Sequence, residues 1–252
     1  MKQLFAPILT WLGKRIEKRR FHEPPVYIGG CGRSGTTLLL SILSSHPDIF
    51  ACPKELNIFE YAAVKSGKLV LPKHYRLYRT FITHKIKKSA TRYCEKSPSN
   101  IHHIDELTDL HNGNFKLIHI LRDGRDVILS KHPKKEKGYW VDPERWVQDV
   151  REGLKYSNHP NVYTVKYEEL VSNFEKNIRD ICSFLDIEPG TEILNWHRHA
   201  TVRENNALFS SIREISSTSV GKWKQEIHAD RVAELTSLPE AMELLRVTGY
   251  LD

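Results

Sequence analysis

The feature that most constrains the fold of this chain is the glycine-rich stretch Gly29–Thr37 (GGCGRSGTT). Just before it, Val26–Gly30 has the apolar pattern of a short buried strand, and Thr36–Ser45 has that of an apolar helix. Glycines allow the backbone to turn tightly, and the start of a helix offers free N–H groups to an anion. We therefore predict a strand–loop–helix cradle for a phosphate. Its candidate binding residues are Arg33, Ser34, Gly35, Thr36 and Thr37.

The cradle differs from that of an ATP-dependent enzyme. Gly30 and Gly35 have the spacing of the nucleotide P-loop, but Thr36 occupies the position of its lysine. A kinase or NTPase uses that lysine on the β- and γ-phosphates and needs an acidic residue for magnesium. Here the cation is Arg33, inside the loop. The stretch favours an anion site that works without metal, and a P-loop kinase of small molecules stays as an alternative.

A second candidate anion site follows another buried strand, predicted over Phe115–Leu121. Arg122 stands at the end of that strand, and Ser130 lies two turns further on in a helix predicted over Asp126–His132. A parallel sheet places such strand ends on one edge. Two anion sites on one edge suit a nucleotide that is phosphorylated at two positions. A non-catalytic module that binds glycan or another anion is the remaining alternative.

The order of elements predicts an α/β fold with a central parallel sheet flanked by helices. Residues 24–252 are expected to form a single domain, because no repeat, low-complexity segment or linker interrupts them. Further strands are predicted over Ile49–Cys52, Arg92–Glu95 and Val162–Lys166. Further helices are predicted over Glu55–Lys65, Tyr75–Lys88, Asn100–Leu110, Pro143–Tyr156, Phe174–Leu185 and Ala229–Leu245.

Residues 1–23 form a basic segment ahead of this domain. Its apolar stretch Leu4–Leu12 is far shorter than the roughly 20 residues of a membrane span, and its basic residues follow that stretch, whereas a secretory signal has them before it. We expect a short amphipathic helix that packs on the domain. In a second interpretation residues 1–20 rest on a membrane surface, with Phe5, Ile8 and Trp11 inserted. The expected location is cytoplasmic, with peripheral membrane contact as the alternative.

With these motifs the chain resembles the sulfotransferase superfamily, over about residues 26–224. The resemblance implies a P-loop-like fold and the donor 3′-phosphoadenosine 5′-phosphosulfate (PAPS), with adenosine 3′,5′-bisphosphate (PAP) as product and no metal. It implies that the loop Arg33–Thr37 holds the 5′-phosphosulfate and that Arg122 and Ser130 hold the 3′-phosphate. Tyr167 is expected near the adenosine, and Lys222 in a C-terminal lid.

One branch, the tyrosylprotein sulfotransferases and their bacterial relatives, is similar in three further stretches: His46–Asp48 (HPD), Cys52–Glu55 (CPKE) and Cys94–Pro98 (CEKSP). This chain has one more residue than the branch between HPD and the first cysteine. It also has Asn57 where the branch has an arginine. The acceptor therefore stays open among glycan, glycolipid, peptide tyrosine and small phenol, and nucleic acid is not expected. The oligomeric state also stays open.

The resemblance implies in-line sulfuryl transfer to a hydroxyl or, less favoured, an amine, with Glu55 as the base that takes the acceptor proton. His46 is the rival base, since other sulfotransferases use a histidine. Lys96 and Arg33 are expected to stabilise charge on the leaving phosphate. The plainer alternatives are a first-turn acid of a helix for Glu55 and a solvated surface lysine for Lys96.

The four cysteines form no CxxC pair, so a zinc site is not predicted. In the tyrosylprotein branch, cysteines placed like Cys52 and Cys94 form a disulfide. We expect reduced thiols in this chain, with Cα atoms within about 7 Å, because the two cysteines flank Glu55 and Lys96. The acceptor is expected to contact Ile58–Lys88 and Lys134–Tyr139. The basic residues of Ile58–Lys88 either indicate an acidic or glycan acceptor or, in the favoured alternative, form a solvated helix face.

Overall fold

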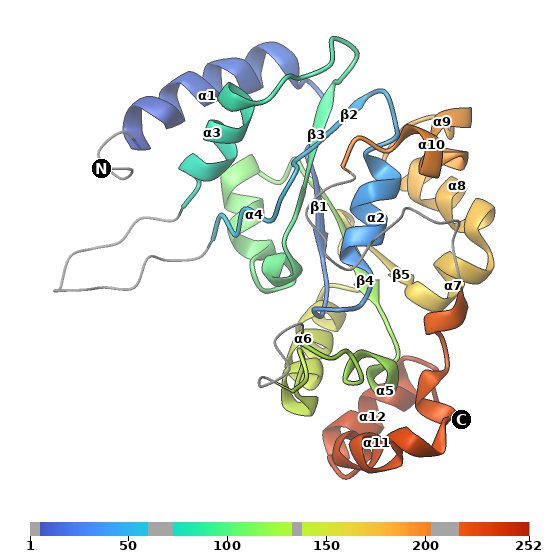
Figure 1. Cartoon of the computed structure of the whole chain (residues 1–252). Helices are drawn as coiled ribbons and strands as arrows, with labels where there is room; N and C mark the ends of the chain where they lie inside the picture. The colour runs from blue at the N-terminus through green and yellow to red at the C-terminus, as the bar shows by residue number, and fades with distance from the viewer. Residues whose placement is uncertain (1–5, 60–72, 133–137, 203–216, 252) are drawn as a thin grey trace, which may run out of the picture.

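The computed structural model describes residues 6–59, 73–132, 138–202 and 217–251. Its centre is a five-stranded sheet of order β2-β3-β1-β4-β5, in which every pairing is parallel (Figure 1). This confirms the predicted α/β class. The strands are β1 (Val26–Gly29), β2 (Ile49–Ala51), β3 (Arg92–Lys96), β4 (Lys116–Leu121) and β5 (Val162–Lys166).

Helices cover both faces of the sheet (Figure 1). One face carries α1 (Ala6–Arg20), α3 (Tyr75–Thr83), α4 (Ile104–His111) and α6 (Pro143–Lys155). The other carries α2 (Thr36–Leu43), α7 (Tyr167–Ser172), α8 (Phe174–Phe184), α9 (Thr191–Leu194) and α10 (Trp196–His199). The helices α11 (Ala229–Thr236) and α12 (Pro239–Val247) pack beside α6. Shorter elements are η1 (Pro98–His102), α5 (Gly124–Val127), η3 (Ser217–Ser219), η4 (Lys222–Lys224) and η5 (Glu226–His228).

The central strand β1 shows why the sheet is buried on both sides. Val26 and Ile28 join the core cluster that includes α2 and α8, whereas Tyr27 joins the cluster beneath α3 and α4. Successive side chains of a strand point to opposite faces, so a continuous apolar run is needed where helices cover both. All four residues of β1 are buried accordingly.

Two predicted helices are wrong in extent next to the site. The helix predicted over Asp126–His132 ends at Val127, and the chain then turns so that Lys131 bridges to Tyr139. The helix predicted over Glu55–Lys65 does not begin at Glu55, since residues 55–57 are not helical, and the N–H of Leu56 donates to a side chain of β3. Residues 60–65 of that prediction lie outside the described residues.

Two other helices are shorter than predicted. The helix that begins at Tyr75 ends at Thr83, five residues early. The final helix, predicted over Ala229–Leu245, is divided into α11 and α12. The division falls at Leu238, whose extended backbone precedes Pro239, because proline disfavours a helical residue before it.

The N-terminal segment forms a longer helix than predicted, α1, and it packs on α3 as expected. Gly13 allows this contact, since a Cβ at that position would clash with Tyr78 of α3. Phe5, which was expected beside Ile8 and Trp11, lies outside the described residues. Among the described helices, none is both long and apolar enough to cross a membrane.

Candidate active site

The glycine-rich loop follows β1 and ends at the first turn of α2, as predicted. Three of its residues have positive φ, namely Gly30 with 144°, Arg33 with 72° and Gly35 with 105°. Gly35 precedes α2 and lies against the ring of Tyr167, where a Cβ would not fit. Thr36 and Thr37 then form the first turn of α2, so their N–H groups are unsatisfied helix-terminal donors. This is the cradle that the sequence indicated.

Unpartnered polar atoms gather in the cradle. Within the described residues, the Nε atoms of Arg33 and Arg122 and the hydroxyl of Ser34 are buried and have no hydrogen-bond partner. Buried donors in folded proteins are almost always paired. None of the ion pairs formed between described residues involves Arg33 or Arg122. The arrangement therefore suits an anion with several oxygen acceptors.

The two arginines lie next to each other. The Nη1 of Arg122 donates to the carbonyl oxygen of Arg33 at 3.0 Å. Burial and the neighbouring charge of Arg122 lower the pKa of Arg33 from its ordinary value. Two guanidinium groups side by side repel each other unless an anion lies between or beside them. The arginines of the two predicted anion sites are thus neighbours in the structure.

Tyr167 completes this side of the site. The guanidinium of Arg122 stacks 4.3 Å from the centre of its ring. The Tyr167 hydroxyl lies 2.7 Å from the hydroxyl of Ser219. Arg122 also donates to the carbonyl oxygen of Ser219 at 2.6 Å. A C-terminal segment, residues 217–224, which we call the strap, therefore closes over Arg122 and Tyr167.

Asp126 anchors the strap. One carboxylate oxygen accepts from the N–H of Gly221 at 2.7 Å, and the other accepts from the N–H of Trp223 at 3.1 Å. The ring of Trp223 lies 3.6 Å from the guanidinium of Arg125. Asp126 holds the strap through backbone N–H groups, so the amino-acid sequence of the strap alone does not reveal this contact.

Two predicted binding residues are less engaged. Ser130 is half-buried in the turn after α5, and its carbonyl oxygen accepts from the N–H of Trp140 at 2.9 Å. It does not lie two helical turns after Arg122, because α5 ends at Val127. Lys222 is exposed on the strap. Within the described residues, neither side chain forms a hydrogen bond with Arg122.

The predicted catalytic pair is together. The Nζ of Lys96 donates to the carboxylate of Glu55, and the lysine is almost fully buried while the glutamate is 45% exposed. Lys96 ends β3 and lies opposite Ile28 of β1, one residue before the glycine-rich loop. The pair therefore stands at the same sheet edge as the cradle. Lys96 is buried, so a solvated surface lysine is not what the structure shows.

Comparison with known proteins agrees with this geometry. The model of the sulfotransferase domain family matches residues 23–242, most of the chain. The chain belongs to the sulfotransferase family. It is 27% identical, over 90% of its length and 89% of the relative, to a Caenorhabditis briggsae protein whose name includes protein-tyrosine sulfotransferase.

Solved sulfotransferase structures share the fold. The sulfotransferase domain of the Synechococcus olefin synthase superposes with a TM-score of 0.59 at 20% identity, over 86% of this chain and 96% of that domain. A mouse sulfotransferase complexed with PAP superposes with a TM-score of 0.53 at 17% identity, over 96% of this chain and 93% of that protein. At these identities the likeness establishes the fold alone.

A residue that sequence reasoning missed supports the segment that carries Glu55. Glu95, fully buried on β3, accepts from the N–H of Leu56 at 3.1 Å and from the hydroxyl of Ser97 at 2.6 Å. The Ser97 hydroxyl in turn accepts from the N–H of Asn57 at 3.0 Å. Burial raises the pKa of Glu95 from its ordinary value. No local sequence pattern marks Glu95, because its partner Leu56 comes from a separate segment of the chain.

His46, the rival base, lies elsewhere. It precedes β2, whereas Glu55 follows that strand, so the two are at opposite edges of the parallel sheet. Its Nδ1 accepts from the N–H of Asp48 at 3.2 Å, and its Nε2 lies 3.0 Å from the carbonyl oxygen of Glu188. Both ring nitrogens of His46 therefore have structural partners.

Cys52 and Cys94 are neighbours, as predicted. The N–H of Cys52 donates to the carbonyl oxygen of Cys94 at 2.8 Å, and adjacent strands lie about 4.8 Å apart. Both are free thiols. Cys94 packs in the core cluster that contains α2, and Cys52 in the cluster beneath α3. Their side chains thus point to opposite faces of the sheet, which does not suit a disulfide.

Proposed function

We propose that this sulfotransferase uses PAPS as donor and transfers its sulfuryl group to a hydroxyl of the acceptor, with Glu55 as base. The observation that carries the proposal is the group of buried, unpartnered atoms on Arg33, Ser34 and Arg122. PAPS supplies an activated sulfuryl group on a nucleotide with phosphate at both the 5′ and 3′ positions. The adjoining guanidinium groups and the first turn of α2 match that charge.

The residues of the chain divide the binding of such a donor. Ser34, Thr36 and Thr37 would hold the 5′ side at the start of α2, beside Arg33. Arg122 would hold the 3′-phosphate, and the ring of Tyr167 would lie along the nucleoside. Among the described residues, no group of three or more histidine, cysteine or acidic side chains could hold a metal ion.

Glu55 and Lys96 would share the chemical step. As the acceptor oxygen forms its bond to sulfur, its proton passes to the Glu55 carboxylate, and the bond from sulfur to the departing phosphate breaks. Lys96, paired with Glu55, would hold that carboxylate in place and bring a positive charge beside the departing oxygen. The 45% exposure of Glu55 leaves it accessible to an acceptor.

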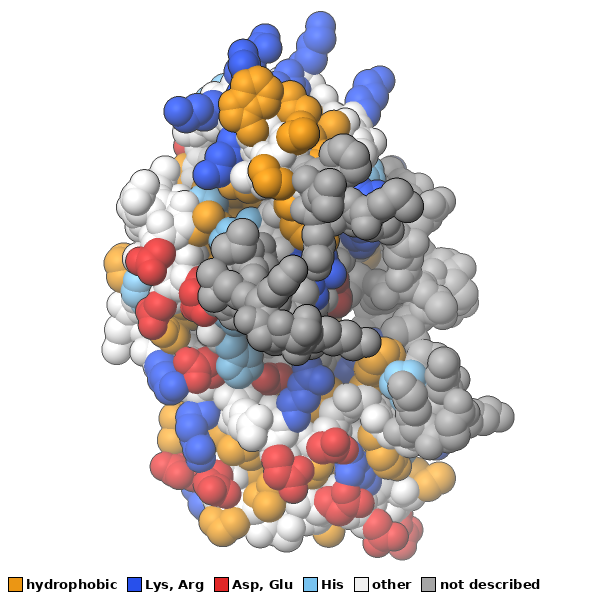
Figure 2. Space-filling model, turned by 90° about the vertical axis from the view of Figure 1, so that its left-hand side faces the viewer, with side chains coloured by type: hydrophobic (Ala, Val, Ile, Leu, Met, Phe, Trp, Pro, Cys, Tyr) orange, Lys and Arg blue, Asp and Glu red, His pale blue; other side chains and the backbone are white. Residues whose placement is uncertain are grey.

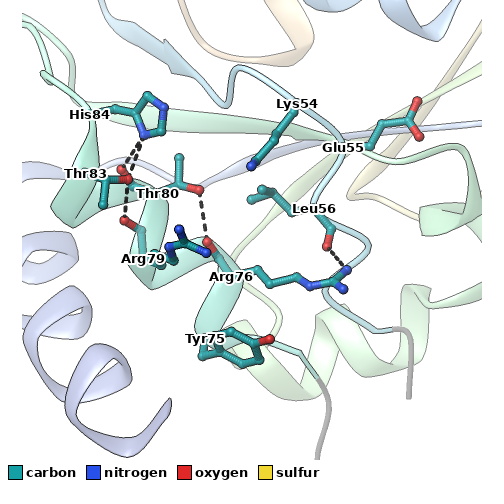
Figure 3. Close-up of a pocket in the computed structure, with 9 residues that line it drawn as sticks. All are labelled: Lys54, Glu55, Leu56, Tyr75, Arg76, Arg79, Thr80, Thr83 and His84. Carbon is teal, nitrogen blue, oxygen red and sulfur yellow. Dashed lines mark hydrogen bonds between the residues drawn. The ribbon is translucent and has the colours of Figure 1, made fainter. Parts of the chain in front are cut away.

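The acceptor side is cationic. A pocket of about 420 Å³ lies between the Lys54–Leu56 segment and α3, and Lys54, Arg76, Arg79 and His84 line it (Figure 3). Figure 3 shows the Glu55 carboxylate directed away from Arg79 and His84. The pocket would therefore bind a part of the acceptor next to the reacting hydroxyl, and its basic side chains favour an acidic part.

This charge favours a peptide tyrosine beside acidic residues as the first acceptor to test, in line with the tyrosine-sulfotransferase name of the C. briggsae relative. The predicted acceptor segment Lys134–Tyr139 lies mostly outside the described residues, as do residues 60–72 of Ile58–Lys88. Acidic glycans, glycolipids and small phenols complete the panel to be assayed with labelled PAPS.

Binding of PAP tests the donor. We expect Arg33→Ala and Arg122→Ala each to weaken PAP binding by more than about tenfold in titration calorimetry, because each removes charge-assisted hydrogen bonds. Arg151→Ala is the matched control, since Arg151 is an exposed arginine on α6 away from the cradle. Unchanged affinity in both cradle variants would show that the donor assignment is wrong.

The two alternatives give different results in the same experiments. A small-molecule kinase binds ATP with magnesium more tightly than PAP. A non-catalytic module binds PAP or an acidic glycan, with an affinity that falls steeply as salt rises, but transfers no label to any acceptor. Tight PAP binding together with labelled product supports the proposed reaction.

A further inference from the structure

The outer face of α1 carries an uncovered apolar group. Ile8, Trp11 and Leu12 are 56%, 58% and 40% exposed. They are three of the eight large hydrophobic side chains that are exposed among the described residues. Their spacing of three and four positions places them on one face of the helix, opposite the Gly13 contact with α3. Nothing in the described part of the chain covers this face.

The same face continues as a basic surface. Arg15, Lys18 and Arg19 extend the spacing of Ile8, Trp11 and Leu12 along α1, and all three are exposed. The Arg15 guanidinium lies 5.0 Å from the centre of the Trp11 ring. Figure 2 shows hydrophobic side chains at the top of the molecule surrounded by Lys and Arg side chains.

No carboxylate of α1 weakens this charge. Glu17, the only acidic residue of the helix, faces inward, where it accepts from the hydroxyl of Tyr93 at 3.1 Å. Arg20 ties the end of α1 to residues 86 and 87 by donating to their carbonyl oxygens. That contact places three further exposed lysines beside the helix end, namely Lys85, Lys87 and Lys88.

We propose that this outer face of α1 binds the surface of an anionic lipid bilayer, with Trp11 and Ile8 inserted among the headgroups and Arg15, Lys18 and Arg19 on the lipid phosphates. The basic side chains favour an anionic lipid surface as the binding partner. They disfavour a second copy of the chain, because two such basic faces repel each other. Helices with one apolar and one strongly basic portion bind such surfaces in the plane. The proposal is independent of the proposed reaction.

Vesicle sedimentation of the full chain tests it. The protein is mixed with vesicles of phosphatidylcholine alone or with about one-third phosphatidylserine added. We expect binding to the anionic vesicles only, weakened by salt. The double variant Ile8→Ser with Trp11→Ser should bind more than about tenfold less tightly. Arg15→Gln with Arg19→Gln should lose about fivefold for each charge removed.

The matched control lies on α12. Arg246→Gln with Val247→Ser removes an exposed arginine and a 69% exposed apolar residue at the end of another helix, and vesicle binding should not change. Because all substituted side chains are exposed, PAP binding should persist in every variant and shows that each is folded. If the wild type itself does not bind PAP, that result contradicts the proposed donor and not the proposed lipid-binding surface.

Three results would each overturn the proposal. The first is the absence of sedimentation with anionic vesicles at low salt. The second is sedimentation that the α1 variants leave unchanged. The third is a dimer in sedimentation velocity that Ile8→Ser with Trp11→Ser converts to monomer, which would make a second copy the occupant of this face.

Discussion

At the scale of single residues, the site depends on one exposed carboxylate held by buried partners. Glu55 pairs with Lys96, while the buried Glu95 fixes the backbone of the next residue, Leu56. A buried carboxylate with three hydrogen-bond donors around it costs stability if any of them is lost. The position of Glu55 is thus set by β3, to which it does not belong.

Glu55→Gln separates chemistry from binding. We expect turnover of labelled PAPS to fall by roughly a hundredfold or more, because glutamine cannot take the acceptor proton, while PAP affinity stays close to that of the wild type. Single-turnover assays with saturating donor measure the first effect and calorimetry the second. The paired control is His46→Ala. An inactive His46 variant together with an active Glu55→Gln enzyme would contradict the assignment.

The residues of the site were readable from sequence where the local chemistry is distinctive. Arg33 and the hydroxyls after it lie in a glycine-rich turn, and Arg122 ends an apolar strand, so both motifs could be recognised. Glu95 could not be assigned a role, because its partners Leu56 and Asn100 come from separate segments that only the fold brings together. Hydrogen bonds between distant segments leave no local pattern.

At the scale of elements, the strap also depends on a contact between segments that are distant in the sequence. Its backbone is held by Asp126, which lies between Arg122 and Ser130 of the second anion motif, nearly one hundred residues earlier in sequence. The strap in turn covers Arg122 and Tyr167 through Ser219. Asp126 therefore couples closure of the strap to the place where we expect the 3′-phosphate.

Asp126→Asn should loosen the strap. Asparagine keeps one acceptor oxygen and loses the other, so one of the two backbone hydrogen bonds, to Gly221 or Trp223, is lost along with the negative charge. We expect trypsin to cleave faster after Lys222 and Lys224, and PAP affinity to fall about fivefold.

Asp230→Asn serves as the control, because Asp230 is an exposed acid in the first turn of α11. It should leave both the cleavage rate and PAP affinity unchanged. Equal cleavage of the Asp126 variant and the wild type would mean that the strap is held by its side chains, among them Trp223 on Arg125.

Element boundaries were the least predictable part of the fold, for physical reasons. α5 ends at Val127 because the following residues turn toward Tyr139, a pairing between segments that local propensity does not reveal. The division of the final helix at Pro239 could have been predicted, because proline disfavours a helical conformation of the residue before it. It was missed because the apolar periodicity continues on both sides of Pro239. The inner strands β1 and β4 were recognised because burial on both faces favours apolar runs. The edge strand β5 is only partly buried and was recognised from its valine and tyrosine residues.

At the scale of the whole molecule, burial of titratable groups on both sides of the sheet makes stability depend on pH. His119 belongs to β4, and its ring packs against Gly153 of α6. Burial lowers the pKa of His119 to about 4 and that of His111 to about 4. Burial raises the pKa of Glu17 and Glu95. These two kinds of group act in opposite directions as the pH changes.

The sign follows from which state binds the proton. An unfolded histidine has a pKa of about 6.5. As pH falls below that value, the histidines of the unfolded chain bind protons, whereas folded His119 and His111 stay neutral until the pH approaches 4. Their contribution to stability is present above about pH 6.5 and is lost as pH falls toward 4. The carboxylates with raised pKa stabilise the fold below about pH 4.5 and lose that contribution as pH rises.

His119→Gln isolates one histidine from this balance. The lowered pKa of His119 costs the wild type about 2 kcal/mol of stability at pH 5 relative to neutral pH. The variant has no imidazole at this position and does not incur that cost. We expect the free energy of unfolding, measured by urea titration at pH 7.5 and pH 5, to fall less in His119→Gln than in the wild type. His22→Gln, a substitution at an exposed histidine, should show the wild-type dependence. An equal fall in all three proteins would mean that His119 is protonated in the folded state, and hence that water reaches it between β4 and α6.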